Sequence, residues 1–239
     1  MSDKLREQVI HIVGLGPGDP DLITLKGKTT LEHSDVVFYP SLTKNGKKHA
    51  EKILRTILPE EPPILNELYF PSTIESNEKE PVIIRNMEII GEAISKGLHV
   101  SFAVLGDPVL FSTFVQMKPH LLRLLPDLRF EIIPGISSIS AGFSSMVLDM
   151  GTEKSSIGII SAPDTEDDII PRLRENDTLI ILKAGKRLEM IRGALEKSGL
   201  VNNAHNLGDV SSGAEKYSKF DGNFRAGEFG YMTLVIVKK

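Results

Sequence analysis

The amino-acid sequence predicts an α/β protein with mainly parallel sheets and a partly antiparallel sheet towards the C-terminus. Short β-rich apolar runs alternate with longer helical patterns over most of the chain, as in folds built from βαβ units. Several of these runs end in glycine, and the helical patterns stop near His205. At 239 residues the chain is long for one compact domain and comfortable for two small ones.

The first part of the chain predicts four strands and four helices. The expected strands are Val9–Val13, Val36–Tyr39, Val100–Leu105 and Phe130–Ile133, and the expected helices are Leu22–His33, Val82–Lys96, Phe111–Leu125 and Ile136–Leu148. Helical spacing of apolar residues predicts the second helix, which Gly97 ends. These residues are Ile83, Met87, Ile90 and Ile94.

The second part repeats the alternation and then changes character. We expect strands at Ser156–Ile160 and Thr178–Leu182, helices at Asp167–Glu175 and Leu188–Ser198, and three final strands without helices between them, within His205–Ser211, Lys216–Phe220 and Tyr231–Val237. In open α/β sheets, ligands bind beyond the carboxyl ends of the strands. The loops after Val13, Leu105, Ile133 and Leu182 are therefore the expected sites of chemistry.

Composition excludes several classes of protein. Cysteine is absent, which excludes disulfides, thiolate metal sites and a cysteine nucleophile, and suits a reducing, cytoplasmic compartment. Lysine plus arginine total 28 against 32 acidic residues, a poor balance for nucleic-acid binding, and no apolar run approaches the ~20 residues of a membrane span. The six histidines show no metal-ligand spacing, and the sequence lacks the Gly-x-Ser-x-Gly elbow of serine hydrolases. We expect no metal site.

The first loop runs Gly14-Leu-Gly-Pro-Gly-Asp-Pro20. It differs from a dinucleotide fingerprint because Asp19 stands where glycine is needed, and the acidic residue expected after the second strand is missing. Asp19 followed by Pro20 instead predicts a helix cap with proline at the first helical position. Three glycines in five residues also allow backbone to approach a ligand closely. Gly27-Lys-Thr29 lacks the earlier glycine of a phosphate-binding loop, and we reject that interpretation.

Two later loops carry similar signals. Asp107-Pro108 again predicts a cap and a helix start, although a glycine and a carboxylate at a strand end could also hold a cationic or hydroxyl-bearing cofactor. Pro134–Ala141 supplies small side chains and backbone N–H groups at a helix start. Its small residues could equally serve close packing of the helix on the sheet.

Together these loops resemble those of the tetrapyrrole methylase family, whose members transfer a methyl group from S-adenosylmethionine to a ring-shaped substrate. The resemblance covers nearly the whole chain in five signatures of fixed order: Val13–Pro20, Leu22–Lys26, Leu105–Pro108, Ile133–Ile136 and Leu182–Gly185. Within the family, three features are most similar to the precorrin-2 carbon-20 methyltransferases of cobalamin assembly: Tyr69–Thr73, Gly106–Phe114, and Pro126-Asp127 ahead of Pro134–Ala141. Phe111 departs from these relatives, which usually have tyrosine there.

The resemblance implies two α/β domains, here residues 1–118 and 127–239 with a hinge near Lys118–Asp127, separated by a cleft and assembled as a homodimer. It implies that S-adenosylmethionine contacts nine residues: Leu105, Gly106, Asp107, Leu110, Ser137, Ser138, Lys183, Ala184 and Gly208. The loop Gly14–Asp19 would face the tetrapyrrole, with Gly16, Pro17 and Gly18 as substrate-binding residues.

S-adenosylmethionine carries its own leaving group, so the protein needs neither a nucleophile nor a metal. Asp19 is a candidate for proton transfer or substrate polarisation, although capping is the favoured interpretation. The carboxylates of a tetrapyrrole could meet the basic loop of Lys44, Lys47, Lys48 and His49, for which a solvated loop is the favoured interpretation.

Three functional hypotheses follow. The first is methylation of carbon 20 of precorrin-2 or of its cobalt-bearing equivalent. The second is a sibling activity, either another tetrapyrrole methylase or a protein methylase similar to diphthine synthase. The third is a non-catalytic nucleotide-binding module, which would bind the cofactor without turning over any tetrapyrrole.

Overall fold

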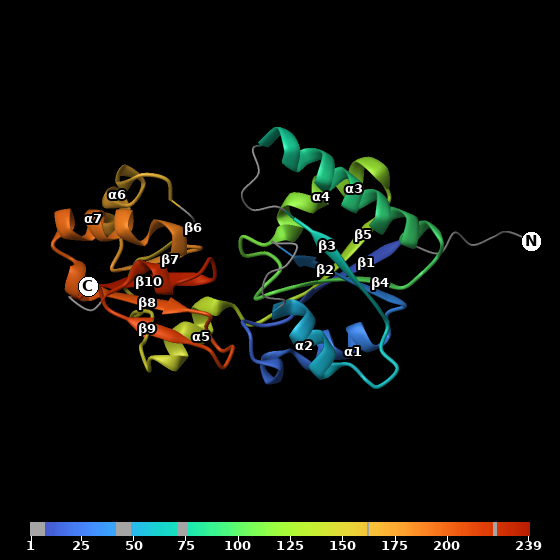
Figure 1. The fold of residues 1–239 in the computed structure, drawn as a ribbon, viewed down its shortest axis with the longest axis horizontal. Helices are drawn as coiled ribbons and strands as arrows, with labels where there is room; N and C mark the ends of the chain where they lie inside the picture. Colours follow the sequence, from blue (N-terminus) through green and yellow to red (C-terminus); the bar gives the residue numbers. More distant parts are fainter. Residues whose placement is uncertain (1–7, 42–48, 71–75, 162, 222–223) are drawn as a thin grey trace, which may run out of the picture. The chain divides into compact units, whose positions relative to one another are not determined.

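The chain forms two compact units, each with its own sheet (Figure 1). The computed structural model describes residues 8–41, 49–70, 76–161, 163–221 and 224–239. The units are Met1–Ser137 and Ser138–Lys239. The first sheet is fully parallel and the second is mixed, which confirms the α/β class and the antiparallel C-terminal part.

The first unit is built on five parallel strands in the order β3-β2-β4-β1-β5. Their bounds are β1 Val9–Gly14, β2 Val36–Ser41, β3 Ile64–Tyr69, β4 Val100–Val104 and β5 Arg129–Ile133. β1 pairs with β4 on one side and β5 on the other, so that Ile10 lies opposite both Val100 and Phe130. The strand that carries the glycine-rich loop is therefore interior to the sheet.

Helices cover both faces of this sheet. α1 (Leu25–Glu32) and α2 (His49–Ile57) lie on one face, and α3 (Ser76–Ser95) and α4 (Thr113–Leu124) lie on the other (Figure 1). The alternation of side chains along each strand explains both layers. In β1, Ile10 and Ile12 pack in the core under α3 and α4, whereas Val13 packs with residues of α1 and α2.

The first unit differs from expectation in a few places. β3 and α2 were not predicted; β3 is an edge strand whose first residue, Ile64, is 68% exposed. The basic residues Lys44, Lys47 and Lys48 lie outside the described residues, and His49 begins α2. α4 begins two residues later than predicted because Phe111 has a φ of +49°, which a right-handed helix cannot contain.

The second unit contains the mixed sheet, with the strand order β6-β7-β10-β8-β9. Its strands are β6 Ile157–Ser161, β7 Thr178–Leu182, β8 Ala204–Gly208, β9 Lys216–Ser218 and β10 Thr233–Lys238. Its helices are α5 (Ser138–Ser145), α6 (Ile170–Glu175) and α7 (Leu188–Ser198). α6 and α7 cover one face and α5 lies on the other (Figure 1). β7 and α7 have the predicted bounds.

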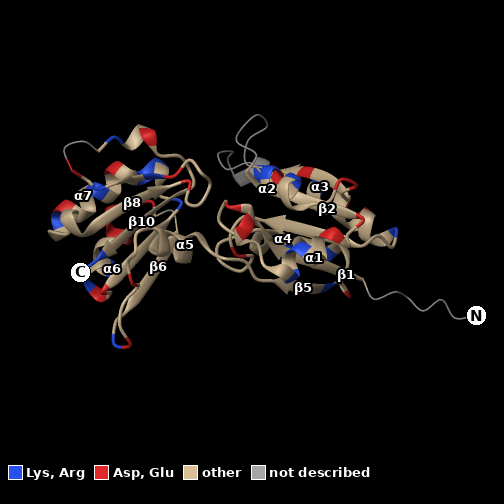
Figure 2. Ribbon diagram, turned by 90° about the horizontal axis from the view of Figure 1, so that it is seen from below, with Lys and Arg blue, Asp and Glu red and all other residues tan. Residues whose placement is uncertain are grey.

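Short 3₁₀ turns complete the two units: Pro20–Leu22, Glu166–Asp168, Gly185–Arg187, Val201–Asn203 and Ala226–Glu228. Opposite charges are interspersed along the helices of both units (Figure 2). Ion pairs one helical turn apart, such as Lys96–Glu92 and Arg192–Glu196, account for part of this pattern. None of the helices in the described ranges is long and apolar enough to cross a membrane.

The boundary between the units lies at Ser137/Ser138. The expected hinge near Lys118–Asp127 falls inside the first unit, within α4 and the turn that follows it. The reason is β5, which pairs with β1 along its whole length and so belongs to the first sheet. The chain therefore leaves the first unit only after the Pro134–Ser137 segment.

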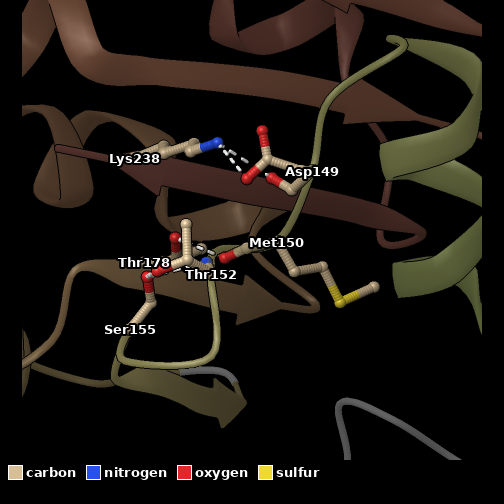
Figure 3. A network of polar contacts seen from close by, with 6 residues as sticks. All are labelled: Asp149, Met150, Thr152, Ser155, Thr178 and Lys238. Carbon is tan, nitrogen blue, oxygen red and sulfur yellow. Dashed lines mark hydrogen bonds and ion pairs between the residues drawn. The ribbon is translucent and has the colours of Figure 1, made fainter.

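Polar contacts join the connection from α5 to β6 to the second sheet at two points (Figure 3). The buried Thr178 hydroxyl donates to the carbonyl of Met150 at 2.9 Å. The Lys238 ammonium contacts the Asp149 carboxylate at 2.6 Å and donates to the Asp149 carbonyl at 3.1 Å. The hydrogen bond and charge of Lys238 lower the pKa of Asp149 below its usual value of 3.8.

We expect this connection to give the second unit an acid-sensitive contribution to stability. Because the folded state lowers the pKa of Asp149, its stabilisation is fully present above about pH 4 and is lost as the pH falls through the lowered value. Asp149→Asn should therefore reduce the free energy of unfolding near neutral pH, and its effect should shrink as the pH falls below the usual pKa of 3.8. Urea unfolding across this pH range measures the difference.

Thr178→Val is the matched control, because it removes the other fastening of the same segment without removing a titratable group. Its cost, about 0.5–1.5 kcal/mol for one lost hydrogen bond, should not depend on pH. A difference between wild type and Asp149→Asn that stays constant from neutral to acid pH would contradict the role of the Asp149–Lys238 pair.

Candidate active site

The carboxyl ends of β1 and β4 lie where the connections of the first sheet change faces, which we call the switch point. These strands are neighbours, yet β1 leads to α1 on one face and β4 leads to α4 on the opposite face. Open α/β sheets bind ligands beyond the strand ends at such a point. The structure thus brings together the Gly14–Asp19 loop and the Leu105–Ser112 loop, two of the segments that the sequence singled out.

Backbone hydrogen bonds join these two loops. The Leu15 N–H donates to the Val104 carbonyl at 2.8 Å, and the Gly106 N–H donates to the Gly16 carbonyl at 2.7 Å. Gly16 and Gly106 form an antiparallel bridge beyond the ends of the parallel strands, with φ angles of +79° and +69°. Glycine adopts this left-handed region without the steric cost that a side chain brings, so both glycines suit the crossing.

A third glycine brings in the loop after β5. A Cβ atom on Gly135 would lie 2.3 Å from the Gly106 carbonyl oxygen, and one on Gly14 would lie 2.6 Å from the Gly135 Cα. Both distances are too short for any side chain. The three loops after β4, β1 and β5 therefore touch through bare backbone, and the crossing needs glycine at 14 and 135 for space.

Asp107 ties two of these loops together. One carboxylate oxygen accepts the Val109 N–H at 2.9 Å and the other accepts the Gly135 N–H at 3.1 Å. The first bond closes a local turn and the second reaches across to the loop after β5. The predicted helix start at Asp107-Pro108 is wrong: α4 begins at Thr113, with Ser112 as its N-cap residue. The cap-like pair starts a turn because the left-handed Phe111 interrupts the helix.

Asp19 has the capping geometry that its sequence context predicts. Its carboxylate accepts the Asp21 N–H at 2.9 Å, and Pro20 opens the 3₁₀ turn Pro20–Leu22. The longer helix α1 has a cap of its own, Thr24, whose hydroxyl accepts the Gly27 N–H. Between the bridge at Gly16 and this turn lie the other predicted substrate residues, Pro17 and Gly18, both partly exposed.

Four of the five predicted cofactor residues of the first unit lie on the loop after β4. Leu105, Gly106, Asp107 and Leu110 are partly exposed. A Cβ on Gly106 would meet no atom within 4 Å, so the space in front of this backbone is open. Ser137 ends this unit and Ser138 begins α5, two and three residues after Gly135.

The remaining predicted residues gather at one edge of the second sheet. β7 and β8 both run antiparallel to β10, so their carboxyl ends lie on either side of its first residue, Thr233. Gly208 is directly paired with Thr233, and the Ala184 N–H donates to the Thr233 carbonyl at 2.9 Å. Lys183 precedes Ala184 at the end of β7. The structure therefore brings Lys183, Ala184 and Gly208 together around one buried threonine.

Lys183 has a left-handed backbone and a side chain near an aromatic ring. Its φ is +56°, and its Nζ lies 6.0 Å from the centre of the Tyr231 ring, within reach of a cation–π interaction. Partial burial lowers the pKa of Lys183 and raises the pKa of Tyr231. The next loop residue but one, Gly185, crosses so close to Gly230 that a Cβ would lie 1.9 Å from its carbonyl oxygen. This crossing fixes the backbone around Lys183.

Gly208 also borders a cavity of about 460 Å³ within the second unit. Met146, Leu148, Leu207 and Val210 give it apolar walls, and His205 and Tyr217 join them. The His205 Nδ1 and the Tyr217 hydroxyl lie 2.8 Å apart. Burial, followed by the charge of Lys219, lowers the pKa of His205. The imidazole therefore favours its neutral form.

The family model for tetrapyrrole (corrin/porphyrin) methylases matches residues 9–216, from β1 into β9. The chain belongs to the tetrapyrrole methylase family. Its membership confirms the family inferred from the loop signatures and makes this tetrapyrrole methylase an enzyme that methylates a corrin- or porphyrin-type ring. The loops at the ends of β1, β4 and β5 in the first unit, and the loop after β7 in the second unit, are segments that carried that resemblance.

This tetrapyrrole methylase is 28% identical over 207 residues to the cobalt-precorrin-2 C(20)-methyltransferase of Salmonella typhimurium, which covers 87% of this chain and 86% of the relative. Two solved structures share its fold. A cobalt-precorrin-4 methyltransferase has a TM-score of 0.75 and 17% identity, covering 97% and 95% of the two chains. Uroporphyrin-III C-methyltransferase from Thermus thermophilus, complexed with S-adenosylhomocysteine, has a TM-score of 0.70 and 21% identity, covering 96% and 97%.

Sequence reasoning missed several residues around these sites. Tyr231 and Thr233 were expected only as part of a strand, and Asp209, with a φ of +50°, was not singled out. No local motif marks Tyr231 and Thr233, because the antiparallel return of β10 between β7 and β8 places them there, and none marks Asp209, which directly follows β8. The link between Asp107 and Gly135 spans 28 residues and also lacks a local signal. Among the described residues, no group of three His, Asp or Glu side chains could hold a metal.

We expect Gly135→Ala to destabilise this methylase, because its Cβ would collide with the Gly106 carbonyl oxygen. Forced shifts of this kind cost about 1–3 kcal/mol or more. Gly91→Ala, within α3, is the matched control: its Cβ would have only Leu125 Cδ1 at 3.9 Å, so the change should stabilise by about 0.5–1 kcal/mol. Urea unfolding compares the two. Equal effects would mean that the crossing tolerates a side chain.

Proposed function

We propose that this enzyme transfers the methyl group of S-adenosylmethionine to carbon 20 of precorrin-2, or of cobalt-precorrin-2 or cobalt-factor II, in cobalamin biosynthesis. The loop contact at the switch point of β1 and β4 carries the proposal, because it joins the predicted cofactor loop to the predicted substrate loop through backbone hydrogen bonds. The similarity to the Salmonella typhimurium enzyme, named for carbon 20, supports the ring position. The second structural neighbour, complexed with S-adenosylhomocysteine, supports the cofactor.

The residues present suit this cofactor. Gly106 offers open space and a left-handed backbone, so a ligand can approach the main chain at Gly106 without meeting a side chain. Asp107, fixed by two backbone N–H groups, supplies a carboxylate that would hold a cationic group of S-adenosylmethionine. Leu105, Leu110, Ser137 and Ser138 would complete the contacts from the first unit and the start of α5, and Lys183, Ala184 and Gly208 those from the second sheet.

S-adenosylmethionine supplies the activated methyl group and its own leaving group when bound. The chain's own task is then to orient the ring carbon against the methyl group and to exclude water. Gly16, Pro17 and Gly18 would contact the tetrapyrrole, next to the bridge that fixes Gly106. Asp19 already uses its carboxylate to cap the 3₁₀ turn, which favours a structural role over proton transfer. A homodimer in the cytoplasm is part of the same proposal, and sedimentation would test its assembly.

The deciding experiment identifies the product. The enzyme is incubated with S-adenosylmethionine carrying a ¹³C-labelled methyl group and with precorrin-2, with or without cobalt. Mass spectrometry should show one methyl group added, and NMR should place the label on carbon 20. A label on another ring carbon would reassign the enzyme to a sibling activity. Cofactor binding without any transfer would favour a non-catalytic module.

We expect one S-adenosylhomocysteine molecule to bind per chain and to raise the melting temperature. Gly106→Leu should weaken binding about tenfold or more, because its side chain would fill the open space. Gly106→Ala carries the same backbone strain in a smaller side chain and should keep most of the affinity. Calorimetry of S-adenosylhomocysteine binding to both variants separates the effect of backbone strain from the effect of a side chain that fills the space of the cofactor. Equal affinities of the two variants and wild type would place the cofactor elsewhere.

Replacing Asp19 distinguishes capping from catalysis. Asparagine caps about as well as aspartate, so Asp19→Asn should keep most of the single-turnover rate at saturating cofactor. Asp19→Ala should lower stability by about 0.5–2 kcal/mol with little further kinetic effect. A loss of roughly 10²–10⁴ in the rate of Asp19→Asn, at unchanged melting temperature and cofactor affinity, would instead assign the carboxylate to proton transfer.

A further inference from the structure

Phe111 combines an unfavourable backbone with an exposed side chain. It lies between β4 and α4 with a φ of +49°, in the left-handed region that bulky side chains rarely occupy. Its side chain is 42% exposed, and Val109 on the same loop is 63% exposed. Burial in a core therefore does not explain why a bulky aromatic residue occupies this position.

The loop that carries Phe111 is held in place on both sides. Asp107 accepts the Val109 N–H through its side chain and the Leu110 N–H through its carbonyl, at 2.9 and 3.4 Å. The Ser112 hydroxyl donates to the carbonyl of the buried Pro108. Because the residues around it are bonded in this way, the left-handed conformation of Phe111 belongs to a defined loop. Conformations of this kind persist where the surroundings impose them, often at ligand sites.

The other left-handed residues besides glycine have simpler explanations. Val147 follows α5 at the position where a left-handed residue ends a helix: its N–H donates to Ser144 and the Leu148 N–H donates to Phe143. Asp209 and Ser211 are short polar residues in turns, and aspartate in particular tolerates this conformation. Lys183 belongs to the predicted cofactor site.

We propose that Phe111, with Val109, forms an apolar surface that contacts the face of the tetrapyrrole and so positions the ring carbon for methylation. The inference rests on the proposed function, since it names a residue for the substrate of that same site. The loop follows β4 at the switch point and is hydrogen-bonded to the predicted substrate loop through Gly106 and Gly16. A tetrapyrrole presents a broad unsaturated face inside a rim of carboxylates, and an aromatic ring with an adjacent aliphatic group suits that face.

Four variants test this role: Phe111→Tyr, Phe111→Leu, Phe111→Gly and, as control, Val147→Gly. The two glycine variants both relieve a left-handed backbone under an exposed apolar side chain, but only Phe111 lies on the loop that is hydrogen-bonded to the predicted substrate loop. For each protein we would measure KM and kcat with precorrin-2, uroporphyrin binding by its absorbance change, S-adenosylhomocysteine affinity by calorimetry, and the melting temperature.

We expect Phe111→Tyr to keep the wild-type KM, because it keeps the ring. Phe111→Leu and Phe111→Gly should raise KM and weaken uroporphyrin binding, by about tenfold for glycine. S-adenosylhomocysteine affinity should not change, and the melting temperatures of both glycine variants should stay within about 4 °C of wild type or rise. Val147→Gly should match wild type in every binding and kinetic measurement.

An unchanged KM in Phe111→Gly, with wild type active, would overturn this inference and leave the proposed function intact. A parallel loss of S-adenosylhomocysteine affinity would overturn it too, because the loop would then serve the cofactor. If wild type neither methylates precorrin-2 nor binds uroporphyrin, the proposed function and this inference both fail.

Discussion

The close crossing of bare backbone at Gly14, Gly106 and Gly135 is the constraint on which the candidate site of the first unit depends. It lets the loops after three adjacent strands touch, with distances that leave no room for a Cβ at Gly14 or Gly135. Once the loops are in contact, main-chain bonds and the Asp107 carboxylate can link them. The site is thus built from groups whose positions the sheet itself fixes, and the flexible side chains are additions to that frame.

The second sheet obeys a similar constraint in a different topology. Gly185 crosses Gly230 with no space for a side chain, and two residues earlier the backbone at Lys183 is left-handed. Here β10 returns antiparallel between β7 and β8, so Thr233 receives Ala184 from one side and Gly208 from the other. Both sheets therefore present main-chain atoms at a strand edge, and both use positive φ angles to do so.

The sequence pattern predicted the elements whose formation depends on neighbouring residues in the chain. β7 and α7 were found at their predicted bounds, because a short apolar run and a helical stripe ending at Gly199 are self-contained signals. β3 was missed because it is an edge strand with polar residues inside it, and its place depends on pairing with β2. The domain boundary was predicted too early in the chain for the same reason. β5 belongs to the first sheet through its pairing with β1, and periodicity does not reveal this pairing. Asp107 resembles a helix cap in the sequence. In the structure the left-handed Phe111 interrupts the helix, and the Asp107 carboxylate accepts a hydrogen bond from Gly135, 28 residues away.

The chemistry of the family explains why the site is built in this way. A methyl donor that carries its own leaving group requires alignment more than it requires an acid, a base or a nucleophile. Alignment is served by rigid backbone, because main-chain groups at strand ends have little conformational freedom to lose when a ligand binds. The strained positions at Phe111 and Lys183 fit the same logic, since each holds a large side chain in a conformation set by its loop. Backbone strain at such residues lowers the stability of the folded state. Interactions elsewhere in each unit offset this loss, as in the interior strands β4 and β7, which are buried along their whole length.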